Sequence, residues 1–338
     1  MTDEAALEDE LSRPSPADVA ALGALQGDIL VLGVSGKMGP SLARLARRAS
    51  DEAKVARRVI GAARFADASA RRALEAHGVE TVVCDALDRA ALEQLPDVPN
   101  VVHMVGQKFG TSGDEPRTWA TNVVAAAHAA ERFRASRIVA FSTGNVYPLT
   151  PARGGGPRET DPVGPIGSYA QSTLARERVL EFYSARYGTK VALLRLNYAV
   201  ETRYGVLRDL ADRLVQGEPV DVTMGQVNVI WQRDANSVAL RCFTHAAAPP
   251  FVLNLTGMPA QPVRSLATRL AARLDVTPAF TGTEGDTALL SNASRCVALF
   301  GEPRMSVDAA LDAVAEWVRG GGRSLSRPTH FEEREGRF

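Results

Sequence analysis

The sequence DILVLGVSGKMG at residues 28–39 joins a short apolar run to three glycines in a GxxGxxG pattern. An apolar run of this length is typical of a strand buried on both faces. Glycines after such a strand permit a tight turn and let backbone N–H groups approach a pyrophosphate at the start of the next helix. A plain strand–helix turn would also contain glycines. We expect a cofactor loop, with contacts from Gly33, Ser35, Gly36, Lys37, Met38 and Gly39.

The segments after this loop alternate between strand and helix patterns. Strands are predicted at 59–62, 80–84, 100–105, 137–142, 191–195 and 251–254, and helices at 39–49, 67–77, 116–134 and 168–187. Such alternation indicates a parallel sheet with helices on both faces. The predicted fold class is therefore α/β, a Rossmann-type doubly wound parallel sheet with a smaller C-terminal substrate-binding lobe.

The predicted domain boundaries follow from where this alternation begins and ends. We expect an N-terminal extension at 1–27, a dinucleotide-binding domain at 28–198 completed by 228–256, a substrate-binding lobe at 199–227 and 257–320, and a tail at 321–338. Within the extension, residues 1–14 are expected to be disordered or loosely attached. Ser15 and Pro16 resemble an N-cap and a first helical residue, so 16–25 is predicted as a short helix.

Composition excludes several classes of function. Lys+Arg and Asp+Glu number 39 each, so no net charge attracts nucleic acid or an anionic membrane. Three cysteines, Cys84, Cys242 and Cys296, lie far apart without a CxxC spacing, which argues against a disulfide framework or a metal site. No apolar run reaches about 18 residues, and the acidic start is unlike a signal peptide. We expect a cytoplasmic protein without a metal.

The residues after the predicted strands indicate the cofactor. NAD-binding domains usually place an acidic residue at the end of the second strand, but here Ala63 and Arg64 occupy that position. An arginine would pair with a 2′-phosphate, and Lys37 would add a second positive charge, so NADP is predicted with NAD as the alternative. The alternative is that Arg64 and Lys37 are ordinary solvated surface residues. Asp85 is predicted to contact the adenine, and Val105 the cofactor at the end of the fourth strand.

Three further motifs give the chain a family resemblance. They are Asn122 in the helix after the fourth strand, FSTGNVY at 141–147 and GSYAQST at 167–173. With the glycine loop, their order and spacing are similar to those of extended short-chain dehydrogenases/reductases, the NAD-dependent epimerase/dehydratase family. The likeness runs from about residue 28 to 200 and continues more thinly to about 318.

The resemblance implies which residues do the chemistry. By position, Tyr169 matches the family's proton-transferring tyrosine, and Thr143 matches the Ser/Thr that holds the same substrate oxygen. The family's lysine, four residues after the tyrosine, is replaced by Thr173, which we expect at the nicotinamide ribose. Three interpretations remain open: another cation or the nicotinium charge activates Tyr169, a different base acts, or the protein binds cofactor without turnover. Lys108 is the nearest cation by sequence.

The resemblance also bears on the substrate. It places Asn145 and Asn197 at the substrate, and we add Glu201, Arg203 and Trp231 as candidate contacts. The two arginines with which relatives hold a nucleotide diphosphate correspond to Val227 and Thr283. We therefore expect an NAD(P)-dependent oxidoreductase or epimerase of a small polyhydroxylated substrate, a sugar or sugar acid. The alternatives are a cofactor-binding sensor or scaffold, and a nucleotide-sugar epimerase/dehydratase.

Assembly is a further expectation from the resemblance. In the family, the helices that match 116–134 and 168–187 pair across a two-fold axis. Apolar side chains on these predicted helices include Trp119, Val123 and Phe182. A homodimer is therefore predicted, with a small molecule as the other partner.

Overall fold

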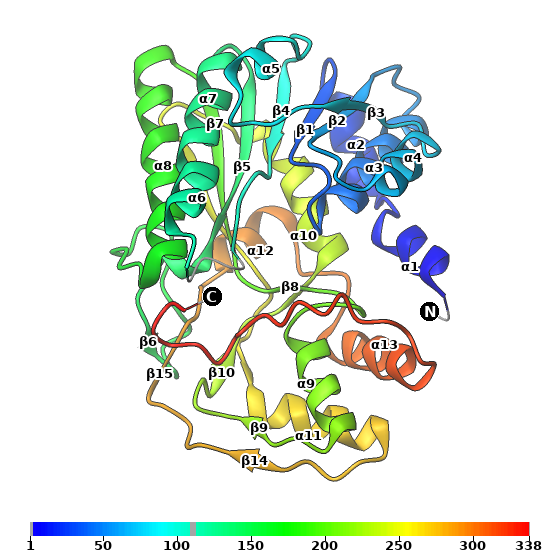
Figure 1. Ribbon diagram of the computed structural model, residues 1–338, viewed down its shortest axis with the longest axis vertical. Helices are drawn as coiled ribbons and strands as arrows, with labels where there is room; N and C mark the ends of the chain where they lie inside the picture. Colours follow the sequence, from blue (N-terminus) through cyan, green and yellow to red (C-terminus); the bar gives the residue numbers. More distant parts are fainter. Residues whose placement is uncertain (1–2, 109–112, 338) are drawn as a thin grey trace.

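A computed structural model describes residues 3–108 and 113–337 of the chain. Its centre is a seven-stranded parallel sheet (Figure 1). From one edge to the other, the strands are β3 (Glu80–Val83), β2 (Val59–Ala63), β1 (Ile29–Leu32), β4 (Asn100–His103), β5 (Arg137–Thr143), β7 (Lys190–Leu196) and β12 (Phe251–Leu255). The chain winds outward from β1 in both directions, which is the doubly wound Rossmann arrangement. The predicted fold class is confirmed.

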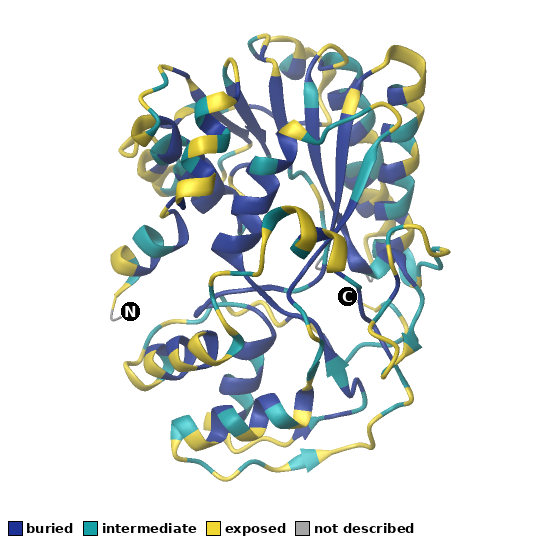
Figure 2. Ribbon diagram, turned by 180° about the vertical axis from the view of Figure 1, so that it is seen from behind, coloured by how far each residue is buried: buried dark blue, intermediate teal, exposed yellow. Residues whose placement is uncertain are grey.

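The central strands are buried because apolar layers cover both faces of the sheet. On β1, Ile29 and Val31 belong to one apolar cluster, whereas Leu30 and Leu32 belong to another. Successive side chains of a strand point to opposite faces, so each cluster lies on its own side. Figure 2 shows the middle of the sheet as dark blue strands. A continuous apolar run, rather than an alternating one, is what this double burial requires.

Two groups of helices form these layers. One comprises α2 (Pro16–Ala24), α3 (Gly39–Glu52) and α10 (Gln232–Arg241), with α4 (Ala68–Glu75) beside it. The other comprises α5 (Arg89–Glu93), α6 (Glu115–Trp119), α7 (Ala125–Arg132) and the long α8 (Gly167–Tyr187). A last helix, α12 (Ser294–Phe300), packs against β12.

The helix predicted over 116–134 is interrupted. A π-helical turn, Ala120–Val124, separates α6 from α7. Such turns insert one extra residue per turn and are frequent at functional sites. Here the turn carries Asn122, whose amide accepts a hydrogen bond from the Gln107 backbone N–H at 2.8 Å and donates to the Gln107 carbonyl at 3.1 Å. The turn therefore fixes the loop that follows β4.

The second lobe lies below the sheet in Figure 1. Its helices are α9 (Val206–Gln216), α11 (Val263–Leu274) and α13 (Val307–Arg319). Four short strand pairs surround them: β8 (Ala199–Val200) with β11 (Ile230–Trp231), β9 (Val220–Asp221) with β14 (Phe280–Thr281), β10 (Gln226–Val227) with β13 (Gln261–Pro262), and β6 (Thr150–Pro151) with β15 (Thr287–Ala288). Among the helices of the described residues, none is long and apolar enough to cross a bilayer.

A helix at the N-terminus corrects the expectation that residues 1–14 are disordered or loosely attached. α1 (Glu4–Leu11) buries Leu7 and Leu11 completely in the apolar cluster of the second lobe. These leucines are four residues apart and therefore share one face of the helix. The acidic residues between them made the segment resemble a solvated extension.

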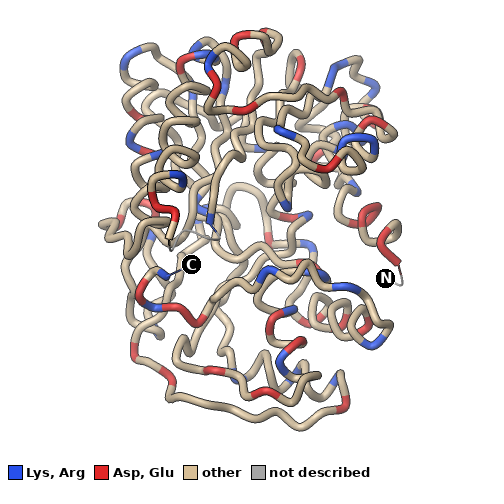
Figure 3. Tube along the Cα trace, in the orientation of Figure 1, with Lys and Arg blue, Asp and Glu red and all other residues tan. Residues whose placement is uncertain are grey.

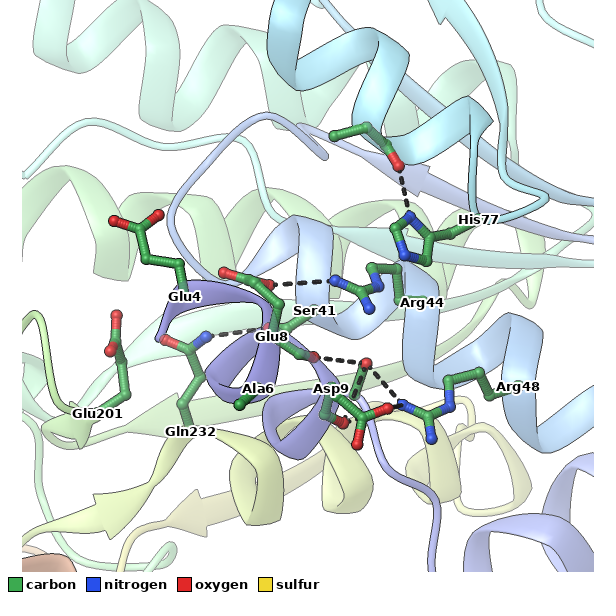
Figure 4. Close-up of polar contacts among 12 residues, drawn as sticks. Glu4, Ala6, Glu8, Asp9, Ser41, Arg44, Arg48, His77, Glu201 and Gln232 are labelled. Carbon is green, nitrogen blue, oxygen red and sulfur yellow. Dashed lines mark hydrogen bonds and ion pairs between the residues drawn. The ribbon is translucent and has the colours of Figure 1, made fainter. Parts of the chain in front are cut away.

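The polar side of α1 faces α3 (Figure 4). Arg48 donates to Asp9 at 2.9 Å, and Arg44 lies 3.6 Å from Glu8. Exposed ion pairs of this kind contribute little stability. The buried leucines are therefore the main reason that α1 is held against the molecule.

The terminal segment, residues 323–337, crosses from α13 back toward α8 (Figure 1). The Thr329 N–H and hydroxyl both donate to the Asp209 carboxylate, at 2.8 and 2.6 Å. Phe331 is buried in the second lobe, and Gly336 packs so closely on Gly167 that a Cβ on either would clash with the other's backbone. The segment predicted as an unassigned tail therefore joins the two lobes.

Candidate active site

A cavity of about 270 Å³ opens at the carboxyl ends of β1, β4, β5 and β7. In doubly wound sheets, ligands bind at this edge, where the strand order reverses. The glycine loop forms one side of the cavity, and Thr143, Asn145, Tyr169 and Asn197 form the other. The structure thus brings the predicted cofactor loop and the predicted catalytic residues into one cavity.

The three loop glycines have different roles. Gly33 has φ +90°, and a Cβ there would lie 2.8 Å from the Val105 nitrogen; a Cβ on Gly39 would lie 2.2 Å from the Val34 carbonyl oxygen. These two glycines are required by packing. A Cβ on Gly36 would meet only the Gly33 oxygen at 3.3 Å, so this position is open toward the cavity.

The start of α3 has no side-chain cap on its N-cap residue, Met38. The Gly39 N–H donates to the Gly36 carbonyl at 3.1 Å, and Pro40 has no N–H, so the helix attracts an anion mainly through the positive end of its dipole. Together with the open side of Gly36, this arrangement fits the pyrophosphate of a dinucleotide.

Tyr169 and Thr143 are joined by a hydrogen bond between their side chains. The Thr143 hydroxyl also donates to the Asn145 amide oxygen at 3.0 Å, which fixes its direction. Burial raises the pKa of Tyr169, while the Thr143 hydrogen bond and the charge of Arg176 lower it in part. A substrate oxygen placed between the two side chains would contact both groups that the chemistry requires.

Thr173 does not supply the positive charge of the absent lysine, although its side-chain hydrogen bond is the smallest of the effects that lower the pKa of Tyr169. Its hydroxyl donates to the Tyr169 backbone carbonyl at 2.9 Å, and the residue is buried outside the cavity lining. Among the described residues, the cation supplied by the same helix is Arg176, which does line the cavity. Residues 169 and 176 are two helical turns apart and therefore share a face of α8.

Arg176 is held rigidly in place. Its guanidinium donates to the Phe141 carbonyl at 2.8 Å, the Asn122 side-chain oxygen at 2.8 Å and the Asn122 carbonyl at 3.0 Å. Burial lowers its pKa to about 10, so it stays charged at neutral pH. The sequence analysis missed this residue, although a search seven residues after Tyr169 would have found it.

Two lysines reach the cavity from opposite sides. Lys108, which follows β4, has its ammonium 5.9 Å from the Tyr169 ring centre and donates to the Thr329 carbonyl at 3.2 Å. Lys37, in the glycine loop, donates to the Ala199 carbonyl at 3.1 Å and lies over the Tyr204 ring at 3.3 Å. The Lys37 ammonium is thus directed toward β8 and the second lobe.

Burial changes the protonation of both lysines. It lowers the pKa of Lys37 to about 7 and that of Lys108 to about 8, although nearby acidic groups partly offset the effect. An ammonium removed from water loses hydration, and this favours the neutral amine. Both lysines are therefore poised to titrate near neutral pH.

The outer cofactor candidates lie away from this cavity. Arg64 is exposed directly after β2, and Ser35 is exposed in the glycine loop. Asp85 is half-buried after β3, and its carboxylate accepts from the Leu87 N–H at 3.0 Å. Val105 supports Gly33 from beneath. Their positions along the sheet edge suit the adenosine half of a dinucleotide.

The predicted substrate contacts separate into two groups. Asn145 and Asn197 line the cavity, and the buried Asn197 side-chain nitrogen has no hydrogen-bond partner among the described residues. Glu201, Arg203 and Trp231 are outside the lining. Unsatisfied buried donors are costly, so the Asn197 amide is a strong candidate for a ligand contact.

The side chains of the second group are engaged with neighbours. Glu201 pairs with Arg203 at 3.1 Å, and Arg203 pairs with Glu8 of α1 at 2.7 Å. Trp231 donates its indole N–H to Glu10 at 2.9 Å. These contacts attach α1 to the second lobe, which sequence spacing alone does not reveal.

His103 is a titratable side chain close to Arg176. It is 1% exposed at the end of β4 and does not line the cavity. Burial, with the charge of Arg176, lowers its pKa to about 3. The imidazole is therefore neutral, and it does not form part of the cavity surface.

Two further arginines, one in α10 and one in α11, are also paired with carboxylates. Arg233 pairs with Glu10, and Arg264 with Glu284 at 2.5 Å. Arg334 of the terminal segment lies beside the turn that follows Thr283. It donates to the Thr287 carbonyl at 2.9 Å, and a Cβ on Gly285 would be 3.3 Å from its guanidinium.

Comparison with known proteins places the chain in a family. The model of the NAD dependent epimerase/dehydratase family matches residues 29–254, so the chain belongs to that family. This agrees with the resemblance found in the sequence. Among curated proteins, no sequence matches this chain.

Solved structures show the same fold. A UDP-glucuronic acid 4-epimerase from Bacillus cereus in complex with NAD has a TM-score of 0.72 at 16% identity, covering 86% of this chain and 98% of its own. A UDP-glucose 4-epimerase from Thermotoga maritima with UDP-glucose has a TM-score of 0.71 at 18% identity, covering 87% and 99%. A dTDP-glucose 4,6-dehydratase from Bacillus anthracis in complex with NAD has a TM-score of 0.73 at 15% identity, covering 87% and 97%.

Proposed function

We propose that this protein is an NAD(P)-dependent epimerase or oxidoreductase that acts on a hydroxyl or carbonyl carbon of a sugar. The observation that carries the proposal is the shared cavity, which joins the glycine loop to the hydrogen-bonded Thr143 and Tyr169. A nicotinamide bound there would supply a hydride acceptor or donor. Tyr169 would take or return the proton at the substrate oxygen, and Thr143 would orient that oxygen.

The proposed activation of Tyr169 replaces the family's lysine by other cations. The Arg176 charge lowers the pKa of Tyr169, although burial raises it overall. The Lys108 ammonium lies 5.9 Å from the Tyr169 ring centre. Positive charge near the phenol favours its ionised form, which is the effect that the family's lysine would otherwise supply.

For the substrate, the comparisons favour a nucleotide sugar, which was the alternative in the sequence analysis. The neighbouring structures are enzymes named for UDP- and dTDP-sugars. A specific observation supports the smaller sugar or sugar acid as a second candidate. Val227, which is buried in β10, and the exposed Thr283 occupy the positions that correspond to the relatives' diphosphate-binding arginines.

A direct assay tests this function. The protein is incubated with NAD or NADP and with UDP-glucose, dTDP-glucose, free sugars or sugar acids, while the absorbance of reduced nicotinamide is followed. Epimerisation returns the hydride within one turnover, so products are also separated and their stereochemistry determined. Turnover of any of these supports the proposal. Tight cofactor binding without turnover across the panel would support the sensor or scaffold instead.

The cofactor proposed is NADP, with NAD as the alternative that the neighbours' bound cofactor supports. Arg64 is exposed after β2, within reach of a 2′-phosphate in this fold. Calorimetry should therefore give tighter binding of NADP than of NAD, and Arg64→Ala should remove the difference. Gly36→Leu should abolish binding of both, and circular dichroism checks that the fold is retained, because a Cβ there would lie 3.3 Å from the Gly33 carbonyl oxygen.

A homodimer is proposed through the outer helices. Trp119 is 39% exposed and Phe182 is 55% exposed, while Val123 and Leu174 are half-buried on the same two helices. Large apolar side chains exposed together mark association surfaces. Light scattering should give twice the 36.1 kDa chain mass. A Trp119→Glu, Phe182→Glu variant should be monomeric.

A further inference from the structure

The cavity has a strong imbalance of charge. Lys37, Lys108 and Arg176 line it, whereas no aspartate or glutamate of the described residues does. Over the whole chain the two signs are equal, at 39 each, and Figure 3 shows them interspersed over both lobes. The concentration of positive charge is therefore local to this cavity.

The two lysines lie on the substrate side rather than at the pyrophosphate. Lys37 extends from the glycine loop to the Ala199 carbonyl and the Tyr204 ring, beyond β7. The Lys108 ammonium is 5.4 Å from the Tyr198 ring centre as well as close to that of Tyr169. Tyr169 is the proposed site of proton transfer, so this ammonium lies beside the side chain that would contact the reacting oxygen.

The acidic groups that act on these lysines are engaged elsewhere. Glu201 and Asp209 attract Lys37, and Asp209 attracts Lys108. Glu201 pairs with Arg203, however, and Asp209 accepts two hydrogen bonds from Thr329. Lys37 and Lys108 donate to backbone carbonyls, which carry no net charge. A bound carboxylate would offer each ammonium a charged acceptor, which makes a stronger hydrogen bond than a carbonyl does.

We propose that the substrate is a sugar acid, whose ring carboxylate is held by Lys37 and Lys108 while Tyr169 and Thr143 hold the reacting hydroxyl. This inference rests on the proposed function and specifies its substrate class. It applies equally to a free uronic acid and to a nucleotide-linked one. The carboxylate is assigned to the sugar ring because Lys108 lies beside the catalytic tyrosine.

The protonation of the lysines gives the proposal a second consequence. Because burial lowers the pKa of Lys37 to about 7 and of Lys108 to about 8, both are partly neutral in mildly alkaline solution. A bound carboxylate favours the charged amines, so binding should take up protons there. The other titratable groups facing the lysines are Tyr169, Tyr198, Tyr204, Glu201, Asp209 and Arg203. Burial raises the pKa of Asp209 only to about 6, so it remains ionised in that range.

The test compares four ligands by calorimetry on the full chain saturated with cofactor. Glucose and glucuronate differ by the carboxylate, as do UDP-glucose and UDP-glucuronate, and the two pairs differ by the nucleotide. In each pair the acid should bind roughly 10- to 100-fold more tightly, the range expected for a hydrogen bond to a charged group. In buffers of different ionisation enthalpy at about pH 8, acid binding should take up protons, and the uptake should be smaller at about pH 6, where both lysines are already charged.

Variants locate the carboxylate. Lys108→Met and Lys37→Met should each reduce the preference for the acid and the proton uptake, while Lys190→Met, an exposed lysine of β7, should change neither. Thermal melts confirm that each variant is folded. An acid preference that survives in both variants would overturn the proposal.

The remaining outcomes separate this inference from the proposed function. If neutral sugars bind as tightly as acids and are turned over, the carboxylate assignment is wrong but the proposed function stands. A third outcome has three parts: the nucleotide increases affinity, the carboxylate does not, and the lysine variants lose the increase due to the nucleotide. In that case the lysines hold the diphosphate and the carboxylate assignment is wrong. If none of the four ligands binds, the sugar substrate itself is overturned.

Discussion

Two groups of buried charged side chains, each with a member in α8, differ in how burial changes their pKa values. Glu177 of α8 and Arg195 of β7 form a buried ion pair at 2.7 Å. Burial alone would lower the pKa of Arg195, but hydrogen bonding and attraction to Glu177 outweigh it, and the pKa is raised. In the cavity, burial lowers the pKa of Lys37, Lys108 and Arg176.

The difference shows how this fold uses charge. In the ion pair, Arg195 also donates to the Tyr147 hydroxyl at 2.8 Å, and that hydroxyl donates to the Asn254 side chain at 2.8 Å. Every member has its partner within the protein, so the network serves the structure. The cations of the cavity face no carboxylate in its lining. Burying them destabilises the fold, but it leaves their positive charge available to a ligand.

The largest effect is expected from breaking the ion pair. Glu177→Gln leaves the buried Arg195 guanidinium without an opposite charge, which should cost about 3–5 kcal/mol of unfolding free energy. Urea denaturation measures it. The control is Glu181→Gln, which removes the partner of Arg178 on the exposed face of the same helix. A loss for Glu177→Gln no larger than the control's would show that the pair does not stabilise the fold.

Tyr169→Phe tests the other group through catalysis. Removing the proposed proton-transfer hydroxyl should lower kcat by about 10²- to 10⁴-fold, the usual contribution of general acid–base catalysis. Cofactor affinity and the urea midpoint should remain those of the wild type. Steady-state kinetics on an identified substrate, with calorimetry for the cofactor, make the measurement. A variant with the full rate would exclude Tyr169 as the proton-transfer group.

Arg176→Met removes the cation that we propose to assist Tyr169. Losing a positive charge raises the pKa of the tyrosine further, so a smaller fraction is ionised at a given pH. The rate at neutral pH should fall about tenfold for each pKa unit, and the pH–rate profile should move to higher pH. Arg178→Met, on the exposed side of α8, serves as the control. A uniformly lower rate with an unmoved profile would indicate a purely structural role.

The last expected effect is a gain in stability. Folded Lys37 has a pKa of about 7, below its ordinary 10.5. Between these values the unfolded chain binds a proton that the folded chain lacks, so the stability of the wild type rises with pH across this window. Lys37→Met should therefore be more stable than the wild type at and below about pH 7, and the difference should shrink toward about pH 10. Urea titrations at both pH values test this, with Lys190→Met as the control for removing a lysine from the exposed surface.

The sequence predicted the parts of the molecule that depend on local pattern. Continuous apolar runs identified β1 and its neighbours, and the glycine spacing identified the loop, because both require particular residues at particular positions. Tyr169 and Thr143 followed from the family motifs, and the structure brings them together. Arg176 lies seven residues after Tyr169, so helical periodicity places the two on one face of α8. The family motif ends at residue 173 and therefore does not include Arg176.

The contacts between distant segments could not be predicted. Glu201 and Arg203 were expected to contact the substrate. Arg203 instead pairs with Glu8 of α1, which lies 195 residues earlier in the chain. Lys37 stood in the glycine loop, yet its ammonium is directed to Ala199, 162 residues later. Spacing along the chain carries no information about such meetings, since they depend on how the two lobes pack.

The terminal segment has a consequence for how fast a ligand can enter. It is fastened to the second lobe by Thr329 on Asp209 and to α8 by Gly336 on Gly167, and Thr329 also touches Lys108. A ligand that approaches Lys108 from this side has to release those contacts before it can bind. Association that waits for such a release is slower than simple docking. The lifetime of these few hydrogen bonds would then set the rate of entry, whatever the final affinity.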